Sequence, residues 1–136
     1  MPGRRGSIVL AGCVAQRAHR AGHTWVFLQY LIGLRQLGFE VLLLDRLDAN
    51  MCLDASGATC KAERSVNVQY LRDVLEQFDL HNDFSVECDD STFIGLSRQD
   101  VLSRVRQADM LVNFNGYLTN ADILSVAAYV ASLTPQ

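Results

Sequence analysis

The sequence predicts an α/β domain in which a parallel sheet has helices on both faces. Short apolar runs typical of buried strands alternate along the chain with longer segments that have helical spacing. The apolar runs are continuous rather than alternating, which is typical of parallel strands covered on both sides. A chain of 136 residues that is 49% hydrophobic and 20% charged matches one folded domain, so we expect a single domain over residues 1–136.

The first third of the chain gives the clearest strand–helix–strand pattern. Residues 7–12 form an apolar run with β-branched residues at its centre, and a glycine ends it. Residues 13–23 are small and polar, which predicts a loop. Thr24 is a natural N-cap for a helix that runs to Leu37, and Gly38 follows as its stop signal. A second strand is expected at residues 40–45.

The rest of the chain continues this alternation after an irregular segment, residues 46–64. The expected elements are a helix at 66–80, a strand at 84–88, a helix at 97–107 capped by Ser97, a strand at 110–115 and a helix at 121–133. Right-handed crossovers then favour a three-layer, Rossmann-like domain of about four strands in the order 3-2-1-4. A flavodoxin-like strand order is the alternative.

Charge is distributed unevenly and excludes several classes of partner. Residues 1–39 hold five arginines and no acid, whereas the other seven basic residues share the remaining sequence with all 15 acids. The arginines are either a solvated face or the mark of an anion site. A pI near 5.5 argues against nucleic-acid binding. No apolar run approaches the roughly 20 residues of a membrane span, so we expect no membrane partner.

The cysteines predict neither a metal centre nor a disulfide framework. Cys13, Cys52, Cys60 and Cys88 contain no C-x-x-C pair, and they have no ligand spacing with the three histidines. A domain with this much apolar material does not need disulfides to fold. We therefore expect no bound metal and four reduced thiols in a cytoplasmic protein.

The candidate site lies where the strand order reverses, at the carboxyl ends of the first and last predicted strands. Residues 13–25 and 113–119 would face this crevice. The first of these segments contains Arg17, Arg20 and Gly22 directly before the expected helix. Exposed amides and the positive end of the helix dipole favour an anion there, either phosphate or carboxylate.

Nucleotide cofactors are not expected. The G-x-G-x-x-G fingerprint is absent, because Gly22 is the next glycine after Gly12, and no Gly-Lys-Ser/Thr of a P-loop occurs. We therefore predict no cofactor. Asp45, at the end of the second predicted strand, stands where a ribose-binding acid would be, or it is a strand-end residue with a local hydrogen bond.

One stretch resembles a known family. Gly22-His23 is followed by TWVFLQYLIGLRQL and then by Gly38-Phe39-Glu40-Val41, and Ala108 to Asn113 (ADMLVN) forms a later strand entry. This pattern is similar to the N-terminal, acceptor-side domain of GT-B-fold glycosyltransferases. The resemblance implies transfer of a glycosyl group from a nucleotide-sugar to a hydroxyl. It also implies a second Rossmann-like domain that binds the donor, so we expect this chain to be truncated and inactive alone.

The resemblance assigns a role to His23, and the residues themselves suggest roles for the other candidates. His23 would be the catalytic base that takes the proton of the acceptor hydroxyl, or else a histidine at a helix start. Arg17, Arg20 and Gly22 would bind an anionic substrate. Trp25 would line an acceptor pocket or lie in the core. Polar side chains near the last strand would bind hydroxyls or make a turn; these residues are Asn113, Asn115 and Tyr117.

A second function fits the same sequence. A stand-alone Rossmann- or flavodoxin-like domain could bind a small anionic ligand for regulation, without catalysis. The exterior separates the two hypotheses, because an exposed apolar patch points to a missing partner and a fully polar exterior points to a complete small domain. The expected ligands are accordingly a small acceptor or a nucleotide-sugar in one case and a simple anion in the other.

Overall fold

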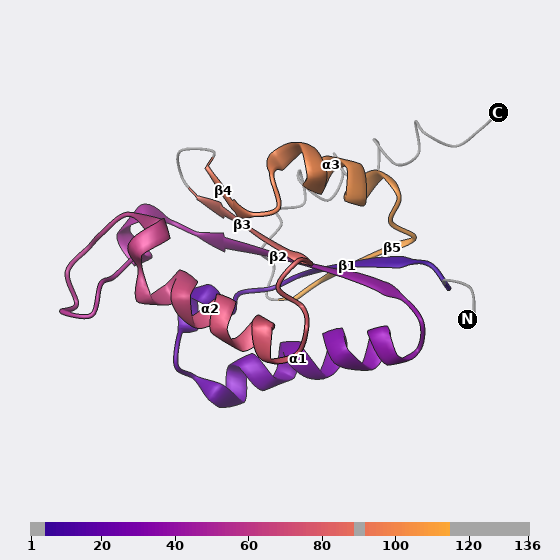
Figure 1. Ribbon diagram of the computed structural model, residues 1–136, viewed down its shortest axis with the longest axis horizontal. Helices are drawn as coiled ribbons and strands as arrows, with labels where there is room; N and C mark the ends of the chain where they lie inside the picture. The colour runs from indigo at the N-terminus through magenta and orange to yellow at the C-terminus, as the bar shows by residue number, and fades with distance from the viewer. Residues whose placement is uncertain (1–4, 89–91, 115–136) are drawn as a thin grey trace.

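The computed structural model describes residues 5–88 and 92–114, which form a five-stranded sheet between two layers of helices (Figure 1). The strand order is β4-β3-β2-β1-β5. The four longer strands run parallel, and β4 pairs antiparallel with β3 at one edge. The strands are β1 (Ser7–Ala11), β2 (Glu40–Leu47), β3 (Phe84–Cys88), β4 (Phe93–Gly95) and β5 (Met110–Asn113).

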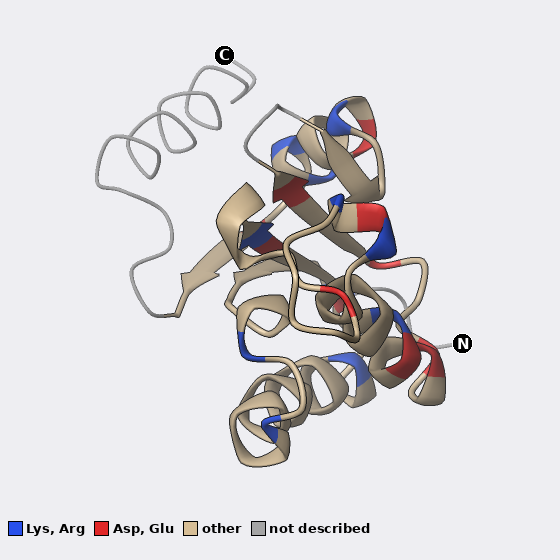
Figure 2. Ribbon diagram, turned by 90° about the vertical axis from the view of Figure 1, so that its left-hand side faces the viewer, with Lys and Arg blue, Asp and Glu red and all other residues tan. Residues whose placement is uncertain are grey.

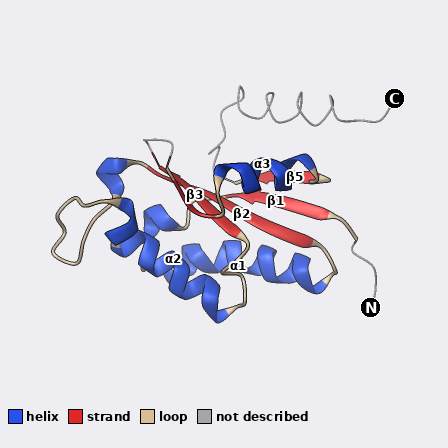
Figure 3. Ribbon diagram, turned by 45° about the horizontal axis from the view of Figure 1, so that its top comes forward, coloured by secondary structure: helices blue, strands red, loops and turns tan. Residues whose placement is uncertain are grey.

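Helices cover both faces of the sheet, as Figures 1 and 3 show. Helices α1 (Ala21–Gln36) and α2 (Val66–Gln77) lie on one face, and α3 (Arg98–Arg106) lies on the other. Alternation along β1 explains the two cores, because neighbouring side chains of a strand point to opposite faces. Leu10 packs in the large cluster with α1 and α2, whereas Val9 packs with Val101 and Val105 of α3.

The predicted class is therefore confirmed as α/β with a mostly parallel sheet, but the strand count and order differ from the prediction. The additional strand is β4, a three-residue strand that the sequence analysis missed. It folds back on β3 through the hydrogen bond from Cys88 N to Thr92 O, 2.8 Å long. The four strands that were predicted occur side by side as β3-β2-β1-β5.

The start of α1 corrects the prediction that Thr24 is an N-cap. The helix begins three residues earlier, at Ala21, and its N-cap Arg20 makes no side-chain capping bond. Thr24 is buried inside the first turns, where its hydroxyl donates to the Arg20 carbonyl at 3.2 Å and lies 2.7 Å from the Tyr70 hydroxyl. A long-range partner on α2 thus replaces the local role that the sequence predicted.

The end of α1 and the starts of the other helices follow the sequence signals. Gly38 takes a φ of +97°, and its N–H bonds to the Arg35 carbonyl while the next N–H reaches Leu34, which is the glycine-ended Schellman motif. Ser65 caps α2 by accepting from Val68 N, and Ser97 caps α3 by accepting from Asp100 N. The expected helix at 121–133 lies outside the described residues.

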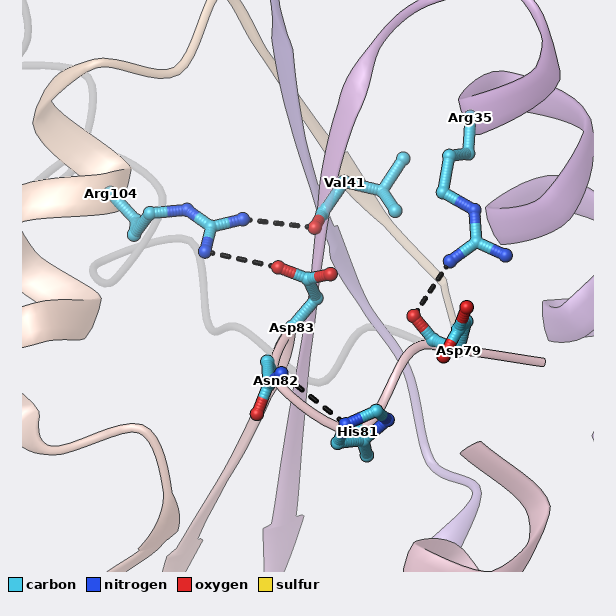
Figure 4. Close-up of polar contacts among 7 residues, drawn as sticks. All are labelled: Arg35, Val41, Asp79, His81, Asn82, Asp83 and Arg104. Atoms are coloured by element: carbon cyan, nitrogen blue, oxygen red, sulfur yellow. Dashed lines mark hydrogen bonds and ion pairs between the residues drawn. The ribbon is translucent and has the colours of Figure 1, made fainter. Parts of the chain in front are cut away.

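Two arginines fix the loop before β3, at the amino edge of the sheet (Figure 4). Arg35 of α1 donates to the backbone carbonyls of Phe78 and Asp79, the second at 2.8 Å. Arg104 of α3 donates to the Val41 carbonyl at 3.0 Å and pairs with Asp83 at 3.3 Å. Both helix layers are thus tied to one turn, so these charged groups serve the architecture.

Candidate functional site

The candidate site is built on the loop that leaves β1 at the carboxyl edge of the sheet. Parallel strands bring the ends of β1, β2, β3 and β5 to this edge. The loop makes a short 3-10 turn at Ala15–Arg17 and enters α1 at Ala21, so His23 lies in the first helical turn. The fold therefore places His23 at the edge where open α/β sheets bind ligands.

Backbone contact fixes the orientation of the His23 ring. Its Nε2 lies 2.9 Å from the carbonyl oxygen of Cys13 and 3.4 Å from the sulfur of the same residue. A carbonyl oxygen can only accept, so Nε2 carries the hydrogen and a neutral ring leaves Nδ1 as its basic nitrogen. The side chain is half-buried, and no carboxylate among the described residues contacts it. A backbone carbonyl therefore orients this histidine in place of an acid.

Phe27 packs against His23 on the buried side of the ring. The two rings meet edge-on with centroids 5.1 Å apart, and Phe27 is only 2% exposed. Gly12 makes room for this ring, since a Cβ at position 12 would lie 2.5 Å from Phe27 Cε1. Packing therefore explains the glycine after the first strand, because a larger residue at position 12 would clash with the Phe27 ring that contacts His23.

Asp45 holds the same loop from inside the protein. Its Oδ2 accepts the N–H groups of Val14 and Ala15, each at 2.8 Å, and its Oδ1 accepts the N–H of Arg46 at 2.7 Å. Burial raises the pKa of Asp45 to about 7, and the three backbone donors oppose that rise. The carboxylate is 5% exposed and fully engaged, so of the two roles left open by the sequence it has the structural one. It also lies within β2, which continues to Leu47.

Two residues that the sequence analysis missed complete the support of the loop. The Asn67 side chain donates to the Ala15 carbonyl at 2.9 Å and accepts from Leu53 N at 3.2 Å. Tyr70 contacts Thr24 through its hydroxyl, and its ring lies 4.8 Å from that of His19. Both residues come from α2, more than 40 positions away from the loop in sequence, so local patterns contained no signal for them.

The predicted anion-binding residues lie on the surface beside His23. Arg17, Arg20 and Gly22 are all exposed, and neither arginine forms an ion pair with any residue that the structure describes. Gly22 has open space where a side chain would be. In Figure 2 most of the α1 ribbon is tan, with basic residues near its ends. These groups are accessible to solvent, and their role in anion binding stays a prediction.

Trp25 lies on a different side of α1. Its ring is 48% exposed and packs against Phe78 at the end of α2, with centroids 5.9 Å apart. Residues two apart on a helix do not face each other, so Trp25 points away from His23. The structure does not bring these two predicted site residues together.

The last strand reaches the site through Phe114. Asn113 ends β5 beside Ala11 of β1, and Phe114 donates its N–H to the Ala11 carbonyl at 2.9 Å. The Phe114 ring contacts both Phe27, at 5.4 Å, and Tyr30, at 4.9 Å. Aromatic rings therefore fill the space between His23 and the end of β5. Asn115 and Tyr117 lie outside the described residues.

A pocket of about 660 Å³ occupies the other end of the same edge. Its walls come from residues 49–63 together with Cys88 at the end of β3 and Thr92. They include Asn50, Cys52, Cys60, Lys61 and Glu63. We call this cavity the 49–63 pocket. Residues 46–64 were expected to be irregular and had no predicted role, although a long connection of this kind often carries function.

No metal centre or membrane span is found in the described ranges. No three His, Cys, Asp or Glu side chains there converge to hold a metal ion. No helix in residues 5–88 and 92–114 is long and apolar enough to cross a bilayer. No disulfide joins the four cysteines, all of which the structure describes.

Comparison with family models, curated proteins and solved structures finds no match to this chain.

Proposed function

We propose that this chain is the acceptor-side domain of a glycosyltransferase, with His23 as the base that activates an acceptor hydroxyl. The observation that carries the proposal is the orientation of His23 at the carboxyl edge of the sheet. With Nε2 bound to the Cys13 carbonyl, the unprotonated nitrogen of the neutral ring is Nδ1. A base of this kind must come within about 2.6–3.2 Å of the hydroxyl whose proton it takes.

The proposed chemistry is a single displacement. The acceptor oxygen attacks the anomeric carbon of a nucleotide-sugar while its proton passes to His23 Nδ1. The bond from the anomeric carbon to the nucleotide breaks, and the nucleotide leaves with the electron pair. Arg17 and Arg20, both exposed beside the first turn of α1, would hold an anionic group of a substrate near this point.

The donor would be bound by a second domain, in the same or another polypeptide. The outer face of α1 supports this part of the proposal. Trp25, Val26, Tyr30 and Leu37 are each between 46% and 56% exposed, and Arg35 is the helix's one ionic residue. An exposed apolar helix face of this extent is typical of a contact surface.

Separate titrations test the proposal. Hydroxyl acceptors such as simple methyl glycosides, nucleotide-sugars and inorganic phosphate would each be added to the isotopically labelled protein, and the histidine ring signals followed. Acceptors should shift the His23 signals and leave those of His81, an exposed residue at the amino edge, unchanged. Phosphate binding at Arg17 and Arg20, with no response of His23 to any hydroxyl compound, would favour the non-catalytic anion-binding alternative.

A further inference from the structure

Two of the cysteines that line the 49–63 pocket lie on the opposed segments of a short hairpin, and the Cys52 thiol donates to the Asp48 carbonyl at 3.5 Å. Leu53 and Thr59 form an antiparallel bridge, and Cys60 N donates to the Cys52 carbonyl at 2.9 Å. Cys52 and Cys60 are therefore the next directly opposed pair. Opposed residues of an antiparallel pair place their side chains on the same face, and both cysteines line the pocket.

The backbone spacing of such a pair suits a covalent link. One backbone hydrogen bond links this pair, because the Cys52 N–H donates to the Ala49 carbonyl at 3.3 Å instead. Directly opposed residues of antiparallel strands have Cα atoms about 4.5–5.5 Å apart. Disulfides usually span Cα separations of about 4.4–6.8 Å. Cys60 is partly exposed, whereas Cys52 is 1% exposed. The Cys60 thiol is therefore accessible to a dissolved reagent, and the Cys52 thiol is not. The rate of thiol–disulfide exchange depends on access to the attacking thiol, so Cys60 would react first.

We propose that Cys52 and Cys60 are a redox-modification site, which a small disulfide such as glutathione disulfide converts to an intramolecular disulfide. The Cys60 thiolate attacks one sulfur of the reagent, and the first glutathione leaves as a thiolate. Cys52 then loses its proton and attacks the Cys60 sulfur, which releases the second glutathione. The protein loses two protons and two electrons, and the reagent takes them up to become two thiols. The proposal does not depend on the glycosyltransferase assignment.

Peptide mapping tests the proposal directly. The folded protein is incubated with glutathione disulfide, the remaining thiols are alkylated, and the chain is digested with trypsin. Cleavage after Arg46 and Lys61 gives one peptide, residues 47–61, which holds both cysteines, while Cys88 and Cys13 fall in other peptides. We expect this peptide to lose about 2 Da relative to its reduced form, and to escape alkylation.

Variants and a denatured control make the outcome decisive. Cys52→Ser should leave one glutathione attached to Cys60, because the second thiol is gone, whereas Cys88→Ser should form the same linked peptide as the wild type. The pairing should also be faster in the folded protein than in the chain unfolded by urea. Alkylation of both cysteines in peptide 47–61, a cross-link from Cys60 to Cys88, or equal rates in the folded and unfolded protein would each overturn the proposal.

Discussion

Replacing Gly12 with alanine should disturb the ring that supports His23. The added Cβ would lie 2.5 Å from Phe27 Cε1 and 2.8 Å from Cδ1, whereas carbon atoms pack best at about 3.5–4.0 Å. The ring must therefore move by about 1 Å. It has little room, because His23 packs on one part of it and Phe114 on another. Overpacking of a dense core costs about 1–3 kcal/mol, so we expect a loss of about 2 kcal/mol.

Urea denaturation measures this loss. With a slope of about 2 kcal/mol per molar urea, the Gly12→Ala midpoint should fall by about 1 M. The control is Gly33→Ala, where a Cβ meets nothing within 4 Å and a mid-helix glycine is removed, so its stability should rise by up to about 1 kcal/mol.

A second substitution tests the cause of the loss. Phe27→Leu shrinks the ring that the new Cβ would strike, so the double variant should lose less stability than the two single variants together. Gly12→Ala with wild-type stability, or strictly additive losses in the double variant, would refute the packing argument.

Three further predictions concern stability. Because burial raises the pKa of Asp45, the folded state holds the carboxyl proton at pH values where the unfolded chain has released it. The wild type should therefore lose stability relative to Asp45→Asn as the pH rises from about 4 to about 7. Urea titrations at several pH values would detect this loss. Arg104→Met should cost about 1–2 kcal/mol, since it removes a carbonyl hydrogen bond and a partly exposed ion pair, whereas Arg98→Met on the exposed start of α3 should change stability little. Ser65→Ala should cost about 1–2 kcal/mol and Ser97→Ala about 0.5–1 kcal/mol, because both lose a cap bond but only Ser65 is buried and also donates to a carbonyl; thermal denaturation would rank them.

The regular elements were predictable because their signals are local. The strand at 84–88 matches β3, and Ser97 caps the third helix as expected. The end of α1 was also predictable, because it requires only a residue such as Gly38 that readily adopts a positive φ. Periodicity, caps and turn residues act over a few positions, so one sequence is enough to locate them.

The errors have non-local causes. Thr24 has the chemistry of an N-cap, but its hydroxyl is used by Tyr70, 46 positions away. The three-residue β4 is too short for an alternating pattern, and its pairing with β3 defines it. Asp45 was expected to end the second strand. Its carboxylate instead accepts three backbone hydrogen bonds, two from the loop after β1 and one from Arg46, and these depend on burial that only the fold creates.

The candidate site was predictable in outline only. Arg17 and Arg20 were proposed from their place before a predicted helix, and His23 was proposed from the family resemblance. The structure puts His23 inside the first turn of α1. The separation of Trp25 from His23 and the filling of the space by Phe27 and Phe114 depend on helix rotation and packing. The 49–63 pocket arises from a segment without regular structure, where sequence patterns give no geometry.

The central claim is that His23 acts as a base in glycosyl transfer, and a rate measurement tests it most directly. The protein is assembled with a candidate for the donor-binding domain that the proposal requires. Transfer from nucleotide-sugar to acceptor is then compared for the wild type, His23→Ala and the amino-edge control His81→Ala. The account predicts a rate about 10²–10⁴-fold lower for His23→Ala, with the fold retained and the control unchanged. A His23→Ala enzyme that folds and keeps the full wild-type rate would contradict it.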